Sequence, residues 1–157
     1  MSGPLRWDVD GRDWPQRDAS RFIDTPGLKW RVVECGSGPA VLLLHGTGAS
    51  AHSWRDVIPL LADSFTVIAP DLPGHGFTRG RPPGGLTLHG IAAALRALME
   101  KLGTRPAMIV GHSAGAAIAL QLAQTADPAV GIVGFNPALM PFPGLAARLF
   151  PALAKLL

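Results

Sequence analysis

The sequence has few charged residues, a single cysteine and no long uninterrupted hydrophobic run. Charged residues make up 16% of the 157 positions and hydrophobic residues 48%, which excludes a disordered chain or a polar tail. One cysteine, Cys35, excludes an internal disulfide and any metal site built from several cysteines, and it suits a reducing compartment. The length corresponds to one domain.

Signals for targeting, membrane insertion and nucleic-acid binding are also missing. The first residues contain no apolar core of signal-peptide length. The most apolar stretch, 107–123, is interrupted by His112, Ser113 and Gln121 and is too short to span a membrane. Lys and Arg number 14 against 11 Asp and Glu, but no basic run tracks a phosphate backbone. We therefore expect a soluble, cytoplasmic protein with no transmembrane segment and no nucleic-acid partner.

Hydrophobic periodicity predicts an alternation of strands and helices. Two alternating segments flank the turn Pro26-Gly27 and predict a β-hairpin over 20–24 and 28–34. The continuous apolar run Ala40–Leu44 predicts a strand that is buried on both faces. The remaining predicted elements are a helix over 54–62, a strand over 65–69, a loop over 70–85, a helix over 88–102, a strand over 107–110, a helix ending near 125 and a strand over 130–135. This order indicates an α/β fold with a mainly parallel sheet.

The sharpest motif is the G-x-S-x-G pattern Gly111-His112-Ser113-Ala114-Gly115, which lies between a predicted strand and a predicted helix. A tight strand-to-helix turn lifts a serine hydroxyl clear of the backbone, and small flanking residues let the turn close. The helix that follows directs its N-terminal amides at the place where negative charge develops. We therefore predict that Ser113 is a nucleophile; the alternative is an ordinary turn serine.

A second motif, His45-Gly46-Thr47-Gly48, ends the strand at 40–44. In this arrangement the backbone amide of Thr47 pairs with that of Ala114 to form an oxyanion hole. One such donor contributes roughly 3–4 kcal/mol of transition-state stabilisation. The alternative is a tight turn that needs glycine for conformational reasons alone.

Together with Asp71-Leu72-Pro73-Gly74-His75-Gly76, these motifs resemble the α/β-hydrolase superfamily. Within it, the chain is similar to the magnesium-chelatase accessory hydrolases of bacteriochlorophyll biosynthesis. The segments that carry this similarity are 14–15, 45–56, 70–78, 111–119 and 141–144. The resemblance implies the N-terminal part of an α/β-hydrolase: core residues over 1–139, with a hairpin and a doubly wound sheet, and the beginning of a cap over 140–157. The last segment also fits an amphipathic piece that touches a membrane.

The resemblance also implies chemistry. It predicts hydrolysis of an ester or related acyl substrate without metal or organic cofactor. The candidate substrate contacts are Gly46, His112, which adjoins the nucleophile, and His75, whose Gly-Pro loop borders the expected substrate site; the alternative for His75 is a structural role in the turn. The resemblance implies magnesium chelatase or a porphyrin intermediate as a partner. Epoxide hydrolases and dehalogenases of the same superfamily carry aspartate at the nucleophile position, so Ser113 argues against those two reactions.

The chain departs from the family where the rest of the catalytic triad should be. The family's acid and histidine follow the serine in chain order. After Ser113 the sequence has one carboxylate, Asp127, and no histidine. Asp127 precedes a proline, which is typical of a turn, and His45 fits a brace for the oxyanion loop better than a base. We therefore expect a truncated chain that is inactive or nearly so, and poorly stable because an apolar strand edge is uncovered.

Two other interpretations remain open. An accessory protein with this fold can bind a porphyrin or a partner without catalysis, because function belongs to the site and not to the fold. The spacing of Gly46, Gly48 and Ala51 also fits a loose dinucleotide-binding fingerprint with Asp71 as the ribose-binding acid. The second interpretation leaves the serine motif unexplained, and its spacing to Asp71 is long.

Overall fold

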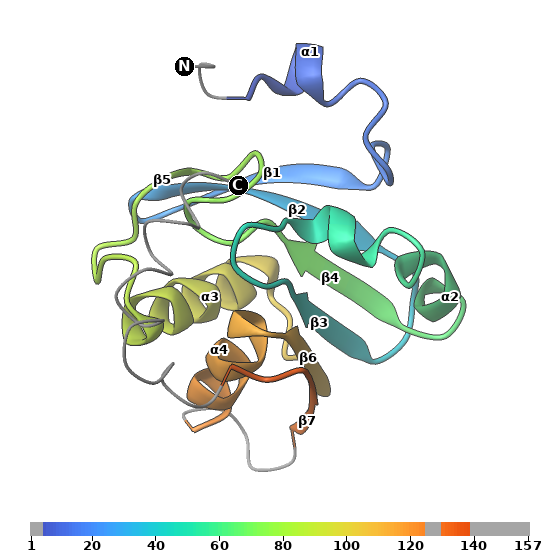
Figure 1. Ribbon diagram of the computed structural model, residues 1–157. Helices are drawn as coiled ribbons and strands as arrows, with labels where there is room; N and C mark the ends of the chain where they lie inside the picture. Colours follow the sequence, from blue (N-terminus) through green and yellow to red (C-terminus); the bar gives the residue numbers. More distant parts are fainter. Residues whose placement is uncertain (1–4, 125–129, 139–157) are drawn as a thin grey trace.

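The computed structural model describes residues 5–124 and 130–138 (Figure 1). The predicted cap segment 140–157 and Asp127 lie outside these described residues. One seven-stranded sheet has the order β1-β2-β4-β3-β6-β7, and a short strand β5 pairs with β2. The strands are β1 Ser20–Thr25, β2 Leu28–Cys35, β3 Ala40–Leu44, β4 Thr66–Pro70, β5 Arg79–Gly80, β6 Met108–His112 and β7 Gly131–Phe135.

The first two strands form the predicted antiparallel hairpin. Their register runs from the pair Ser20 and Val33 to the pair Thr25 and Leu28. Gly27 closes the turn with a φ of 75°, and a Cβ there would lie 2.4 Å from a backbone oxygen of the next loop. Only glycine meets both conditions, so the Pro-Gly turn fixes the hairpin.

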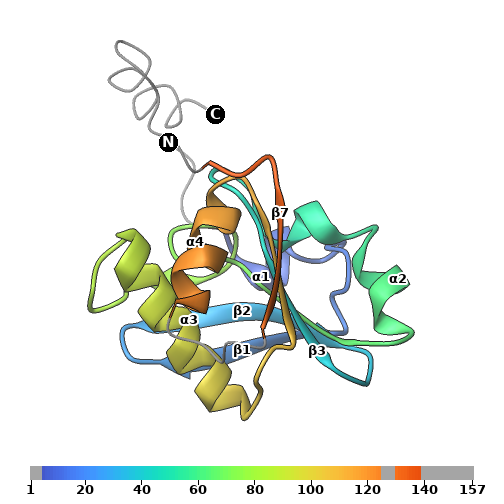
Figure 2. The same ribbon diagram turned by 90° about the horizontal axis from the view of Figure 1, so that it is seen from below.

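The central strands β4, β3, β6 and β7 are parallel. Helices α3 Leu88–Leu102 and α4 Ala114–Ala123 cover one face of this part of the sheet, and α2 Ile58–Ala62 lies on the other (Figure 2). The structure therefore confirms the predicted α/β fold, in which a mainly parallel sheet is extended by an antiparallel hairpin.

Strand β3 is buried over its whole length, as predicted. Leu42 and Leu44 belong to the apolar cluster beneath α3 and α4. Val41 and Leu43 belong to a second cluster with Trp54 on the opposite face. Alternate side chains of one strand thus build two separate cores, which explains why the sequence reads as a continuous apolar run.

The helices agree with the predictions except at two places. Helix α3 has the predicted bounds: the Thr87 hydroxyl caps its start by accepting from an amide, and Gly103 ends it with a φ of 64°. The single helix predicted over 54–62 is wrong, because the chain forms a 3₁₀ turn, η1 Ala51–Trp54, and then the separate helix α2, with Pro59 in its first turn. A short helix, α1 Trp7–Asp10, was not predicted.

Candidate active site

Ser113 occupies a strained turn at the carboxyl end of β6. Its backbone angles are φ 53° and ψ −117°, and it stands directly before the first residue of α4. The Ser113 amide donates to the carbonyl of Phe135 at 2.9 Å, which ties the turn to β7. A non-glycine residue at positive φ costs energy and persists only where the surroundings enforce it. The structure therefore contains the sharp strand-to-helix turn that the sequence predicts.

The two glycines of the motif allow α4 to pack closely against the sheet. A Cβ on Gly111 would lie 2.5 Å from the Cα of Ala116, and a Cβ on Gly115 would lie 2.3 Å from the carbonyl oxygen of Leu44. Real Cβ atoms do not approach backbone atoms this closely. Both positions therefore need glycine, and the turn around Ser113 depends on them.

The loop after β3 lies directly against this turn. A Cβ on Gly46 would be 3.1 Å from the Cβ of Ser113 and 3.3 Å from the carbonyl oxygen of His112. The structure thus brings the two predicted motifs together. Within the described part of the chain, the amides of Thr47 and Ala114 donate to no protein acceptor. Free amides at this place are what an oxyanion hole requires, and their role stays a prediction.

The side chain of His45 holds the loop after β3 in place through two hydrogen bonds, as expected. Its ring is completely buried, Nε2 accepts from the amide of Leu72 at 2.8 Å, and Nδ1 donates to the carbonyl of Gly46 at 2.8 Å. Because Nε2 accepts, the ring is neutral with its proton on Nδ1. Burial lowers the pKa of His45 to about 4, and the neighbouring His75 adds to this effect.

Two further bonds connect the same loops. The Gly48 amide donates to Nε2 of His75 at 3.1 Å, and the Ala51 amide donates to Oδ1 of Asp71 at 2.8 Å. With the bond between Leu72 and His45 they form a set that we call the three-bond strap, which holds the loop after β3 to the loop after β4. His75 therefore supports the loop; its predicted contact with substrate stays a prediction.

Asp71 is a buried structural residue. Its Oδ2 accepts from the Phe77 amide at 2.9 Å, and Nη1 of the equally buried Arg31 lies 3.6 Å from Oδ1. Burial lowers the pKa of Arg31, and Asp71 opposes that shift. An acid with no exposed surface and with both oxygens occupied cannot bind a ribose, so the dinucleotide interpretation is wrong. The 3₁₀ turn that follows Gly48 also offers no long helix for a pyrophosphate.

The described residues bring no base to Ser113. His112 is exposed beside it, His52 packs against the ring of Trp14, and His89 is exposed on α3. In residues 5–124 and 130–138 no hydrogen bond joins the Ser113 hydroxyl to a histidine. The same residues contain no cluster of three potential metal ligands. Their helices include none that is both long and apolar enough to cross a bilayer.

Comparison with known sequences decides the family. The α/β hydrolase fold family matches residues 39–147 of this chain. The chain belongs to the α/β-hydrolase family. The match begins just before β3 and includes both motifs around Ser113.

Individual relatives agree with this assignment. The magnesium-chelatase 30 kDa subunit of Rhodobacter capsulatus is 44% identical over 145 residues, which are 91% of this chain and 51% of the relative. A soluble epoxide hydrolase of Corynebacterium sp. strain C12 is 40% identical over 97 residues, or 62% of this chain and 34% of the relative. A solved structure from Acinetobacter baumannii has a TM-score of 0.77 at 26% identity and covers 100% of this chain and 55% of its own. The chain spans about half the length, or less, of these relatives.

Proposed function

We propose that Ser113 is the nucleophile of a serine hydrolase that acts on an ester or related acyl substrate. The observation that carries the proposal is the strained serine at the head of α4, in contact distance of the loop after β3. Strain of this kind is kept where function requires it. The amides at the start of α4 also favour negative charge beside Ser113.

In the proposed reaction the Ser113 oxygen attacks the carbonyl carbon of the substrate. Its proton passes to a histidine base, and the amides of Thr47 and Ala114 bind the oxyanion. The leaving alcohol takes that proton, and water then releases the acyl group from the serine. A serine hydroxyl needs such a base, unlike an aspartate carboxylate. Because the sequence has no histidine after Ser113, we propose that these 157 residues are inactive or nearly so on their own.

The biological role we propose is accessory to magnesium chelation in bacteriochlorophyll biosynthesis. Its support is the similarity to the magnesium-chelatase 30 kDa subunit over 91% of the chain. The partner is then the chelatase or a porphyrin intermediate. A second candidate is a non-catalytic binding protein with the same fold, and what favours it is that no histidine bonds to Ser113 in the described residues.

The gene sequence beyond codon 157 is the first test. A reading frame that continues into an acid and then a histidine supports the hydrolase. A stop codon directly after Leu157 overturns it for this polypeptide and leaves the binding role.

Labelling by a fluorophosphonate probe tests the nucleophile itself. We expect the gene product to be labelled, Ser113→Ala to abolish labelling, and Ser53→Ala, which removes an exposed hydroxyl in η1, to leave it intact. Labelling that persists in Ser113→Ala would overturn the assignment. The 157-residue chain should label at least about a hundred times more slowly than a version that includes the histidine.

A further inference from the structure

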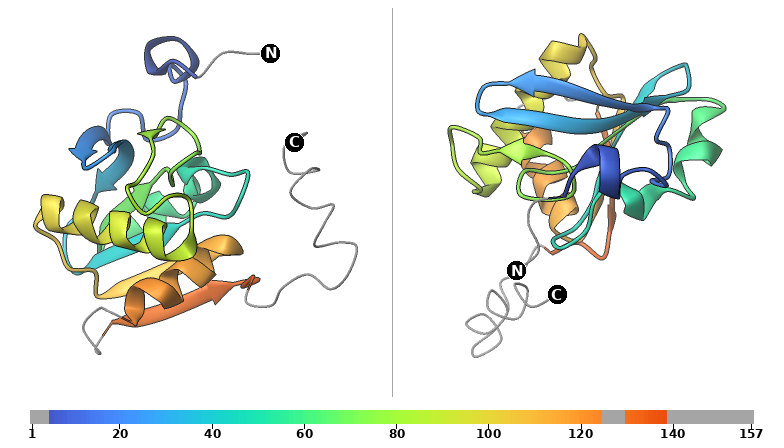
Figure 3. Two further views of the ribbon diagram at one scale, coloured as in Figure 1. Left: turned by 90° about the vertical axis from the view of Figure 1, so that its left-hand side faces the viewer. Right: turned by 90° about the horizontal axis from the view of Figure 1, so that it is seen from above.

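A groove outside the Ser113 site lies between the N-terminal segment and the first hairpin. Its volume is about 360 Å³, within the range of small-molecule sites. Figure 3 shows α1 beyond the hairpin of β1 and β2, on the side away from α3 and α4. None of the residues that line this groove belongs to the two motifs around Ser113.

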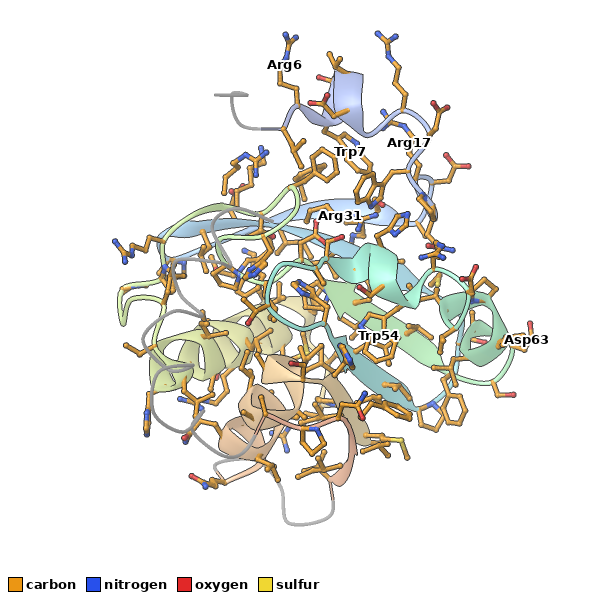
Figure 4. The ribbon with its side chains drawn as sticks, in the orientation of Figure 1. Arg6, Trp7, Arg17, Arg31, Trp54 and Asp63 are labelled. Atoms are coloured by element: carbon orange, nitrogen blue, oxygen red, sulfur yellow. The ribbon has the colours of Figure 1, made fainter. Side chains whose placement is uncertain are left out.

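Three aromatic rings form the apolar part of the groove. Trp7 packs edge-on against Phe77 at 4.8 Å and against Phe22 at 5.6 Å between ring centroids. The guanidinium groups of Arg17 and Arg31 lie 4.6 Å and 5.2 Å from the centre of the Trp7 ring and hold it in place. Figure 4 shows Trp7 pointing from α1 toward the sheet, with Arg31 beneath it. Phe77 is buried, whereas Trp7 is half-buried and Phe22 is exposed, so these last two rings, at 73° to each other, form an apolar corner that solvent reaches.

Two cations and one carboxylate line this corner, and a second carboxylate, Asp24, lies opposite Lys29 in the register of the hairpin. Lys29, Arg79 and Asp8 line the groove, and within the described residues neither cation has a carboxylate within 4.0 Å. Arg79 is held in position because its guanidinium donates to the carbonyls of Gly76, Thr78 and Leu5. Lys29 is exposed, with Nζ 5.8 Å from the centre of the Phe22 ring. A cation held by hydrogen bonds and an exposed cation thus lie beside the same apolar surface.

We propose that this groove binds a small monocarboxylate with a flat apolar body. The body packs against the half-buried ring of Trp7 and the exposed ring of Phe22, and the carboxylate is bound by Lys29 and Arg79. Asp8, on the same groove, disfavours a second negative charge on the ligand. The site is independent of the proposed hydrolysis, because it uses neither Ser113 nor the oxyanion loop.

Calorimetric titration of the gene product with 2-naphthoate tests the proposal. The controls are 2-naphthalenemethanol and 2-naphthylmethylammonium, which have the same ring system and no negative charge. We expect the acid to bind about ten times more tightly than either control, since a hydrogen bond to a charged group contributes about 1.5–3 kcal/mol. Equal affinity for the acid and the alcohol would overturn the anionic assignment, and absence of binding at millimolar acid would overturn the site.

Variants locate the binding. Lys29→Gln should weaken 2-naphthoate binding several-fold and leave the alcohol unaffected, because Lys29 is exposed and its replacement leaves the fold intact. Trp7→Leu should weaken the binding of both 2-naphthoate and 2-naphthalenemethanol. Lys101→Gln, an exposed lysine on α3, is the matched control and should change neither. The proposal would be overturned if Lys29→Gln bound 2-naphthoate as tightly as the unaltered protein does. It would also be overturned if Ser113→Ala lost that binding, because the ligand would then lie at the Ser113 site.

Discussion

Acidification should destabilise the protein through His45. The buried ring accepts a hydrogen bond at Nε2, so the proton that it gains in acid has no acceptor and meets an amide donor. The folded protein therefore binds this proton only near the lowered pKa of about 4, whereas the unfolded chain binds it near the ordinary value of 6.5. Stability is fully present above pH 6.5 and falls as the pH drops toward 4, because the unfolded state binds more protons in this window.

The magnitude follows from the difference between the two pKa values. A shift of one unit corresponds to about 1.4 kcal/mol, so the free energy of unfolding should fall by about 3 kcal/mol between pH 6.5 and pH 4 through this residue. His45 has no solvent-exposed surface, so screening by water does not reduce this figure. A loss of this size is a large part of the stability of a small domain.

Urea unfolding at pH 7, 6, 5 and 4.5, followed by tryptophan fluorescence, measures the effect. Carboxylates also titrate in acid, so the informative quantity is the difference between the unaltered protein and His45→Gln. Gln keeps an acceptor for the Leu72 amide and binds no proton, and this variant should have a shallower pH dependence. His89→Gln removes an exposed histidine and should keep the full dependence. Parallel curves for the unaltered protein and His45→Gln would refute the reasoning.

Three other substitutions or reactions follow from packing, charge and burial. Gly115→Ala should lower the free energy of unfolding, measured in urea, by about 1–3 kcal/mol or more, because the new methyl group would lie 2.3 Å from a carbonyl oxygen. Gly131→Ala, whose methyl group would lie 3.6 Å from the nearest atom, should lower it little, and equal losses for the two variants would contradict the packing argument. Asp71→Asn should cost about 3–5 kcal/mol in the same assay, because it leaves the guanidinium of Arg31 buried without a countercharge, and a cost below 1 kcal/mol would show that water reaches the pair. Cys35 should react with a thiol reagent at pH 7.5 more slowly in the folded protein than in urea, because burial raises its pKa, and equal rates would contradict this.

Local patterns were sufficient to predict most of the fold. The hairpin, β3 and α3 were predictable because their apolar spacing, turn residues and caps all lie within the element itself. The helix predicted over 54–62 was wrong because apolar spacing suggested continuity, whereas a 3₁₀ turn is followed by a new helix that has Pro59 in its first turn. Proline at that position was the signal that could have revealed the break.

The nucleophile turn was predictable for the same reason, since five consecutive residues define it. The buried pair of Arg31 and Asp71 was not, because the two residues lie forty positions apart and meet only through the sheet. An arginine between the buried residues Trp30 and Val32 was the available clue. Helix α1 could not be predicted from local sequence, because the residue that packs it against the fold, Trp7, contacts rings and guanidinium groups that are distant in the sequence.

The three-bond strap has a consequence for transplanting this chemistry. In each of its bonds a backbone amide of one loop meets a side chain of the other, and the side chains come from both loops. Residues 45–51 moved alone into another scaffold would lose the acceptors at His75 and Asp71, and His45 would lose its donor. The two loops are therefore one portable unit, and a graft or a library that varies one of them must carry residues 71–78 with it.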